Sequence, residues 1–193
     1  VHVYNGVIAV GAAQGQYRKQ DLVPFGEYVP LEGLLRGLIA FFDLPMSGFS
    51  AGGADQPLLQ LKNLRAAMLI CYEIAYPATV RSQSLDADVL LTISNDTWFG
   101  SSIGPLQHMQ IAQMRARETG RWILRATNNG VTGIINPKGE ITASLPQFQA
   151  AVLHGSFQAV TGSTPFQRLG NWPVLILSFL IFGMAMASRR SGR

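Results

Sequence analysis

The chain has 193 residues, enough for one domain that buries roughly two thirds of the surface its unfolded form would expose. Hydrophobic residues make up 48% of the sequence and charged residues only 13%, about half the charged share of a typical soluble domain. The net charge of +4 comes partly from Arg189, Arg190 and Arg193. No stripe interleaves Lys or Arg with aromatic residues, which excludes a typical nucleic-acid-binding surface.

Cys71 is the single cysteine of the chain. It excludes an internal disulfide and any metal site built from several cysteines, so we expect a free thiol and neither a metal nor another cofactor. The sequence opens with Val1 rather than Met and has no charged leader, so we expect a piece of a longer protein. We also expect a monomer.

Predicted strands and helices alternate along the chain. Apolar runs predict strands at Val1–Val10, Leu58–Leu61, Ala66–Cys71, Val89–Ser94, Trp122–Ala126 and Val131–Ile135. Two prolines open helices, which are predicted at Pro77–Leu85 and Pro105–Thr119. Asn129-Gly130 and Pro137-Lys138-Gly139 predict hairpin turns. This mixture predicts an α/β sandwich in which helices cover a β-sheet.

The segment Leu169–Ser188 contains no charged residue and has an arginine on either side. Its twenty residues would span roughly 30 Å as a helix, the thickness of the hydrocarbon core of a bilayer. We therefore expect one domain over 1–165, a transmembrane helix over 169–188 and a tail over 189–193, whose arginines favour the cytoplasmic side. The alternative is a buried core helix, because the unbroken apolar part from Val174 to Ala187 is shorter than many membrane spans.

A second apolar segment, Leu31–Phe42, places its leucines and other large apolar residues on one helical face. Packing against the core is the interpretation we favour, and a lid that lies in the lipid interface is the alternative. The glycine-rich stretch Pro45–Pro57 is a loop by composition. Together the two segments suggest a gate.

Cys71 ends a buried strand, where a side chain projects from a rigid sheet edge with little freedom, and this suits a nucleophile. Taken alone it is better explained as a packed core thiol, since free cysteine is among the most buried residue types. The adjacent Tyr72 and Glu73 favour the nucleophile, because a purely structural strand would remain apolar there. A thiol also needs a nearby cation or base in order to ionise at neutral pH.

Two other segments offer polar groups for such a site. Lys19 precedes the turn-rich run VPFGEYVP, which contains Glu27, although a solvated surface lysine is the simpler interpretation of Lys19 alone. Residues 95–100, with Trp98, form a polar and aromatic loop directly after a buried strand, at an edge where ligand sites are common. A plain turn is the alternative for that loop.

Five motifs follow one another along the chain: VPFGEYVP, ICYE, ISNDTWFG, GPLQH and ATNNGVTGIINPKGE. With the terminal apolar helix, they make the chain resemble the apolipoprotein N-acyltransferase family, membrane enzymes of the nitrilase superfamily. The resemblance implies a nitrilase-like αββα sandwich that lacks its N-terminal part, followed by the last transmembrane helix of a multi-span protein. It also implies the bacterial inner membrane, with the catalytic domain on the periplasmic side and the C-terminus in the cytoplasm.

The same resemblance implies the chemistry. Cys71 matches the nucleophile that accepts an acyl chain from a phospholipid as a thioester, and Lys19 matches the lysine that stabilises the thiolate and the oxyanion. Supporting positions match Glu27, Tyr72 and Glu73. Trp98 matches the substrate-facing loop. The acceptor would be the N-terminal amine of the diacylglyceryl-cysteine of an apolipoprotein, in the last step of lipoprotein maturation.

One catalytic residue of that family is missing from the sequence. Its general-base glutamate belongs to a part of the domain upstream of Val1, so we expect this piece to be inactive alone. Glu27 or Glu73 as a substitute base is a weaker hypothesis.

Three other functions remain open. A membrane-tethered nitrilase-like amidase would use the same Cys71 and Lys19 but release its acyl group to water. A Cys–His hydrolase would need His108 or His154 beside the thiol. A non-catalytic membrane-anchored module would merely pack Cys71 in its core.

Overall fold

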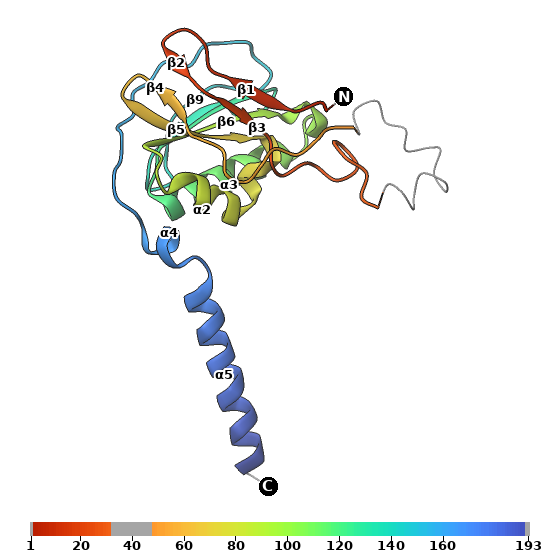
Figure 1. Cartoon of the computed structure of the whole chain (residues 1–193), viewed down its shortest axis with the longest axis vertical. Coiled ribbons are helices and arrows are strands. Elements are labelled where there is room, and N and C mark those ends of the chain that lie inside the picture. The colour runs from red at the N-terminus through yellow and green to blue at the C-terminus, as the bar shows by residue number, and fades with distance from the viewer. Residues whose placement is uncertain (1, 32–47, 192–193) are drawn as a thin grey trace.

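A computed structural model describes residues 2–31 and 48–191 of the chain (Figure 1). The amphipathic helix predicted over residues 31–42 lies, apart from Leu31, outside the described residues. The loop predicted over residues 45–57 is described from residue 48 onward and forms no helix there.

A mixed seven-stranded sheet is the centre of the domain. Its strand order is β2-β4-β5-β6-β7-β8-β9, in which β5–β6 and β6–β7 are parallel and the outer pairs antiparallel. The strands are β2 (Ala13–Gln14), β4 (Leu59–Leu61), β5 (Leu64–Ile70), β6 (Val89–Asn95), β7 (Ile123–Asn128), β8 (Gly133–Ile135) and β9 (Ile141–Ser144). The nearly continuous apolar runs of β5 and β6 place them at the centre, because a parallel strand is covered on both faces.

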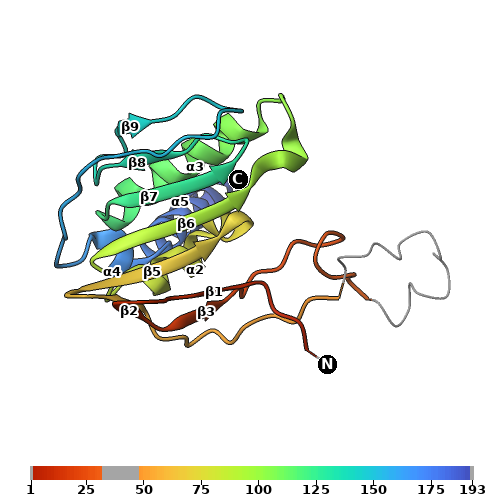
Figure 2. The ribbon, with the colours of Figure 1, turned by 90° about the horizontal axis from the view of Figure 1, so that it is seen from above.

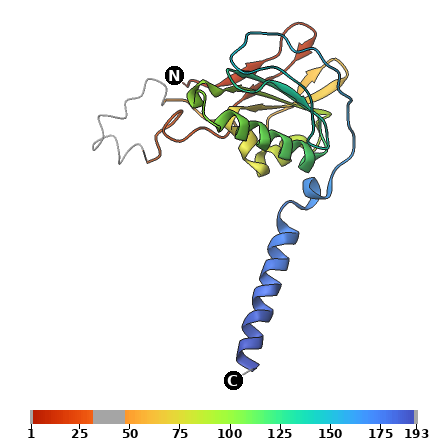
Figure 3. The same ribbon diagram turned by 180° about the vertical axis from the view of Figure 1, so that it is seen from behind.

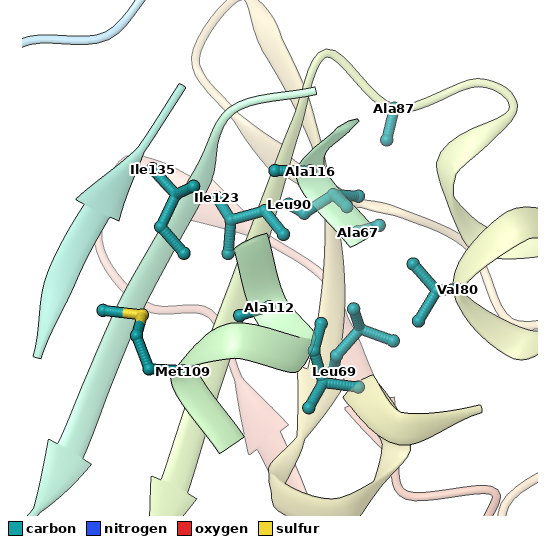
Figure 4. Close-up of a cluster of buried hydrophobic side chains, with 11 residues drawn as sticks. Ala67, Leu69, Val80, Ala87, Leu90, Met109, Ala112, Ala116, Ile123 and Ile135 are labelled. Atoms are coloured by element: carbon teal, nitrogen blue, oxygen red, sulfur yellow. The ribbon is translucent and has the colours of Figure 1, made fainter. Parts of the chain in front are cut away.

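Two helices cover one face of this sheet (Figure 2). Helix α2 (Pro77–Ser84) has its proline in the first turn, and α3 (Gly104–Thr119) ends at Gly120, whose φ of +61° suits glycine. Figure 4 shows the core between these layers, in which Ala112 and Ala116 of α3 face large side chains of the sheet such as Leu90 and Ile123. The small residues let the helix approach the sheet closely.

The second face of the sheet carries a separate apolar cluster. Ala66, Met68 and Ile70 alternate along β5 with the residues of the helix-facing core and pack with Tyr17. Tyr17 belongs to β3 (Gln16–Arg18), which forms a two-stranded antiparallel ribbon with β1 (Gly6–Ile8). The described residues thus form one α layer and one β layer of the predicted αββα sandwich, with this ribbon on the second face.

Most predicted elements occur where the pattern placed them. The strand predicted over residues 1–10 is shorter, and β1 covers only Gly6–Ile8. The predicted hairpin after β7 exists, but its pairing begins at Arg125 and Gly133, so residues 126–132 form a wider turn than the expected two-residue turn. Within this turn Gly130 packs against Asp96, and a Cβ at that position would clash with Oδ2 of the carboxylate.

The C-terminal part forms two helices, α4 (Pro165–Leu169) and α5 (Trp172–Ser191). The helix predicted from Leu169 begins three residues later, because the chain turns at Gly170 with a φ of +57°. Helix α5 is long and apolar enough to cross a membrane, with a mean hydropathy of 1.6 over Trp172–Arg189 and none of that stretch buried. It projects from the side of the domain that α2 and α3 cover, so it is not a buried core helix (Figures 1 and 3).

Gln167 joins this C-terminal part to the domain. Its fully buried side chain donates to the carbonyl oxygen of Ser84 at 3.0 Å and to its hydroxyl at 2.9 Å, and accepts from the Thr164 amide at 2.9 Å. Arg81 of α2 donates in turn to the Gln167 carbonyl at 2.8 Å. Helix α4 is therefore fixed to α2 immediately before the apolar helix begins.

We expect Gln167→Leu to loosen this junction, because the apolar side chain leaves the Thr164 amide without its acceptor and Ser84 without its donor. A lost buried hydrogen bond of this kind costs about 1–3 kcal/mol. Hydrogen exchange should then accelerate in the amides of residues 164–169, whereas the exposed control Gln149→Leu should not change it. Unchanged protection in Gln167→Leu would show that α4 is held in another way.

Candidate active site

Cys71 stands at the carboxyl end of β5 and begins the short 3-10 helix η2 (Cys71–Ala75). It is partly exposed and carries a free thiol. Its φ is +55°, in the left-handed region, which costs a non-glycine residue about 1–2 kcal/mol. Backbone strain of this kind clusters at functional sites, where it holds a side chain in one orientation.

Glu73 connects the nucleophile segment to the ribbon on the second face. Its fully buried carboxylate accepts from the Ile70 amide at 2.7 Å, from the Tyr17 hydroxyl at 2.7 Å and from the amides of Gln20 and Asp21 at 2.6 and 3.3 Å. Burial raises the pKa of Glu73 above its usual value, although the four hydrogen bonds act in the opposite direction. This carboxylate holds the chain around residue 20 against the turn that carries Cys71.

Lys19 immediately precedes that held segment and is only 1% exposed. Its Nζ donates to Oε2 of Glu27 at 2.6 Å, so Lys19 is not the solvated surface lysine of the simpler interpretation. Glu27 also accepts from the Val23 amide and from Asn5 Nδ2, at 2.8 and 2.9 Å. The lysine is therefore buried and fixed by a carboxylate that is itself fixed.

The exposed members of the predicted site lie on the same edge of the sheet. Tyr72 is 41% exposed and meets Tyr76 edge-to-face, with ring centroids 5.1 Å apart. Trp98 is 74% exposed in the 3-10 helix η3 (Asp96–Phe99), which follows β6, the strand beside β5. The structure thus gathers Cys71, the anchored Lys19 segment and these aromatic rings at the carboxyl ends of the parallel strands.

Three charged residues close to Cys71 were missed as a group by the sequence analysis. Asp96 is fully buried and accepts from Ser94 Oγ at 2.8 Å, from Arg125 Nη2 at 2.8 Å and from His108 Nδ1 at 2.9 Å. From the sequence, His108 was considered only as a possible partner of the thiol in a Cys–His hydrolase, and Asp96 only as part of the loop over residues 95–100. The available signal was Arg125, a charged residue in the otherwise apolar start of β7.

The electrostatics of this group follow from its burial. Burial raises the pKa of Asp96, but the His108 hydrogen bond and the Arg125 charge outweigh it, and the pKa falls below its usual value. Burial lowers the pKa of Arg125, against the influence of Asp96 and of Cys71. Asp96 is therefore an anion between two basic side chains, and Arg125 interacts electrostatically with Cys71.

Neither candidate histidine of a Cys–His pair is placed as a base for the thiol. His108 directs Nδ1 at Asp96 and Nε2 at the backbone oxygen of Cys71, 3.2 Å away, so both ring nitrogens face oxygen atoms. His154 is exposed. Among the described residues no group of three or more His, Cys, Asp or Glu is arranged to hold a metal ion.

Comparisons with known proteins show the family to which the chain belongs. The model of the carbon-nitrogen hydrolase family matches residues 2–166, so the chain belongs to that family. Solved structures with the same fold include NitFhit of Caenorhabditis elegans (TM-score 0.56, 17% identity, covering 76% of this chain and 36% of that one) and Nit3 of Saccharomyces cerevisiae (TM-score 0.50, 17% identity, 68% and 44%).

Closer relatives carry one common name. The chain is 58% identical over 190 residues to the apolipoprotein N-acyltransferase of Azotobacter vinelandii and 55% identical over 187 residues to that of Pseudomonas aeruginosa. It is also 53% identical over 163 residues to the one of Shewanella oneidensis. These alignments cover 98%, 97% and 84% of the chain, but it spans only 37%, 37% and 32% of the length of these relatives.

We expect Glu73→Gln to destabilise the site, because an amide NH2 group must then face one of the four N–H or O–H donors. One buried donor left without an acceptor costs about 1–3 kcal/mol, and each kcal/mol lowers the melting temperature of a domain of this size by about 2–4 °C. Thermal unfolding measures the effect, with the exposed Glu140→Gln as control. An unchanged melting temperature would mean that Glu73 does not hold the two segments together.

Proposed function

We propose that this chain contributes the nucleophile-bearing part of an apolipoprotein N-acyltransferase. One arrangement carries the proposal: the partly exposed thiol of Cys71 ends a central strand, and the buried carboxylate of Glu73 ties it to the segment of the buried Lys19. The shared name of relatives that are 53–58% identical supports the same reaction. An apolar helix follows the domain directly, which suits a lipid substrate.

The reaction proceeds in two steps through a thioester. The Cys71 thiolate attacks the ester carbonyl of a phospholipid, and the tetrahedral intermediate collapses to the thioester while the lysophospholipid leaves with a proton. The N-terminal amine of a diacylglyceryl-cysteine then attacks the thioester, forms the amide and returns the sulfur as a thiol. Two half-reactions through one acyl-enzyme predict ping-pong kinetics.

Lys19 stabilises the thiolate and the oxyanion, and Glu27 keeps its ammonium in place. Glu27 already accepts from Lys19, Asn5 and the Val23 amide, so positioning suits it better than the role of a general base. Glu73 accepts four hydrogen bonds, so it too is better suited to positioning than to the role of a general base. Proton transfer is therefore assigned to the glutamate that the family resemblance places outside this sequence.

The exposed rings at the same edge would meet the substrates. Trp98 offers a large exposed apolar surface in η3, after the strand next to β5, and Tyr72 lies next to the thiol in the chain. Helix α5 would cross the inner membrane with its arginines in the cytoplasm, which leaves the domain on the periplasmic side. The protein would act there as a monomer on phospholipid and apolipoprotein.

The other functions are less well supported. A Cys–His hydrolase lacks a placed base, because both nitrogens of His108 face oxygen atoms other than the thiol and His154 is exposed. A non-catalytic module would not need the buried pair of Lys19 and Glu27. A membrane-tethered amidase shares the residues and differs in its acceptor, so product analysis separates it: free fatty acid indicates hydrolysis, and an N-acylated peptide indicates transfer.

The thioester is the first test. The complete protein containing this chain, incubated with phospholipid and no acceptor, should carry an acyl adduct on the Cys71 peptide in mass spectrometry, and Cys71→Ala should carry none. Lys19→Met should slow adduct formation by about a hundredfold to a thousandfold, since an oxyanion contact is lost. The control Lys138→Met, at an exposed turn, should be unaffected. Turnover with an unmodified thiol would overturn the proposal.

The membrane assignment has its own test. An insertion assay on the segment 169–191 should show efficient insertion, and Leu180→Arg near the centre of α5 should make it less favourable by about 3–4 kcal/mol. Leu180→Phe is the matched control and should insert as the natural segment does. A natural segment that stays outside the bilayer would remove the proposed membrane span.

A further inference from the structure

The buried charges behind Cys71 have no part in the proposed acyl transfer. Asp96 lies at the start of η3, His108 on α3 and Arg125 on β7, so three elements converge on one carboxylate. Asp96 is completely buried, and His108 and Arg125 are 8% and 2% exposed. Charged groups are rarely buried to this degree unless each is paired, and here each is paired through Asp96.

His108 links this cluster to Cys71 through its two ring nitrogens. Its Nδ1 lies 2.9 Å from Asp96 Oδ1, and its Nε2 lies 3.2 Å from the carbonyl oxygen of Cys71. A carbonyl oxygen can only accept a hydrogen bond, so Nε2 is the donor in the contact with Cys71. The charged groups that face it are Asp96 from η3 and, beyond Asp96, Arg125 from β7.

The carbonyl oxygen that His108 contacts belongs to a residue with a strained backbone. Cys71 has a φ of +55°, a conformation that a non-glycine residue keeps only when its surroundings hold it. The thiol packs with the apolar cluster on the Tyr17 side of the sheet, whereas His108 approaches from the helix side and reaches only the carbonyl group. His108 therefore acts on the orientation of the residue rather than on the proton of the sulfur.

We propose that His108 is a positioning residue for Cys71, which fixes the left-handed turn of the nucleophile through its carbonyl oxygen. Asp96 orients the imidazole ring, and Arg125 fixes Asp96 from β7. Gly130 packs directly against Asp96, and any side chain at that position would clash with the carboxylate. The inference rests on the proposed acyl transfer for its kinetic consequences but not for its geometry.

Two substitutions at position 108 separate the two hydrogen bonds. In His108→Asn the amide nitrogen replaces Nδ1, so the bond to Asp96 survives and the bond to Cys71 is lost. In His108→Gln the amide nitrogen replaces Nε2, so the bond to Cys71 survives and the bond to Asp96 is lost. If His108 only stabilised the fold, the activity of the two variants would not depend on whether the bond to Cys71 survives.

The complete protein in detergent micelles with phospholipid provides the kinetic readout. Misplacing a reacting group by about 1 Å costs about a hundredfold in rate. We therefore expect the rate constant for thioester formation to fall about tenfold to a hundredfold in His108→Asn, with the KM for phospholipid changed less than threefold. We expect His108→Gln to recover at least half of that loss on a logarithmic scale. Equal rates in both variants and the natural protein would overturn the proposal.

A second measurement keeps the inference separate from the proposed function. Alkylation of Cys71 by iodoacetamide needs no lipid, and we expect its rate to follow the same order, with His108→Asn slowest. If the natural protein forms no thioester but this order holds, the acyl transfer fails and the positioning role stands. If the thioester forms but alkylation is equal in all variants, the positioning role fails.

Matched controls identify general damage to the fold. His154→Asn makes the same chemical change at an exposed histidine, and Met109→Leu changes the buried neighbour of His108 on α3 with nearly conserved volume. Both should keep the rate of thioester formation within twofold. Losses of rate in both position-108 variants that merely follow their melting temperatures, without recovery in His108→Gln, would contradict the proposal.

Discussion

The buried carboxylate of Glu73 is the constraint on which the site depends. It accepts four hydrogen bonds, from the end of β5, from the ribbon strand β3 and from the loop that follows Lys19. A carboxylate without water around it must be satisfied by the protein, so the three segments are held in one relative position. That position brings the lysine segment, distant in the sequence, to the turn that carries the nucleophile.

Cys71 is held from both faces of the sheet. On the ribbon side, Glu73 fixes the turn and the partly exposed Cys71 packs against an apolar cluster; on the helix side, the His108 ring reaches the carbonyl of the same residue. Each side uses a buried ionisable group that is completely paired, which makes the geometry rigid, because either group would be costly to leave unpaired. A strained nucleophile between two rigid supports suits a reaction that forms a covalent intermediate.

The attachment of helix α5 to the domain would set the position of the site relative to the bilayer. The apolar helix is fixed to the domain through Gln167, which is bonded to Ser84 of α2, and α2 follows the turn of Cys71 closely in the chain. The orientation of the domain above a membrane would therefore be transmitted through this short junction between α4 and α2. In the proposed function, this contact keeps the thiol at a constant position relative to its lipid substrate.

The sequence alone determined what depends on local pattern: the strands and helices of the α/β domain, the apolar terminal helix and Cys71 at a strand end, because side-chain periodicity and proline act over a few residues. It could not show that Lys19 is buried against Glu27, and an isolated lysine was read as exposed. Nor could it join Asp96, His108 and Arg125, which lie on three elements. Tertiary structure decided these contacts, because pairing between buried charges depends on how separate elements pack and leaves no periodic signal in the chain.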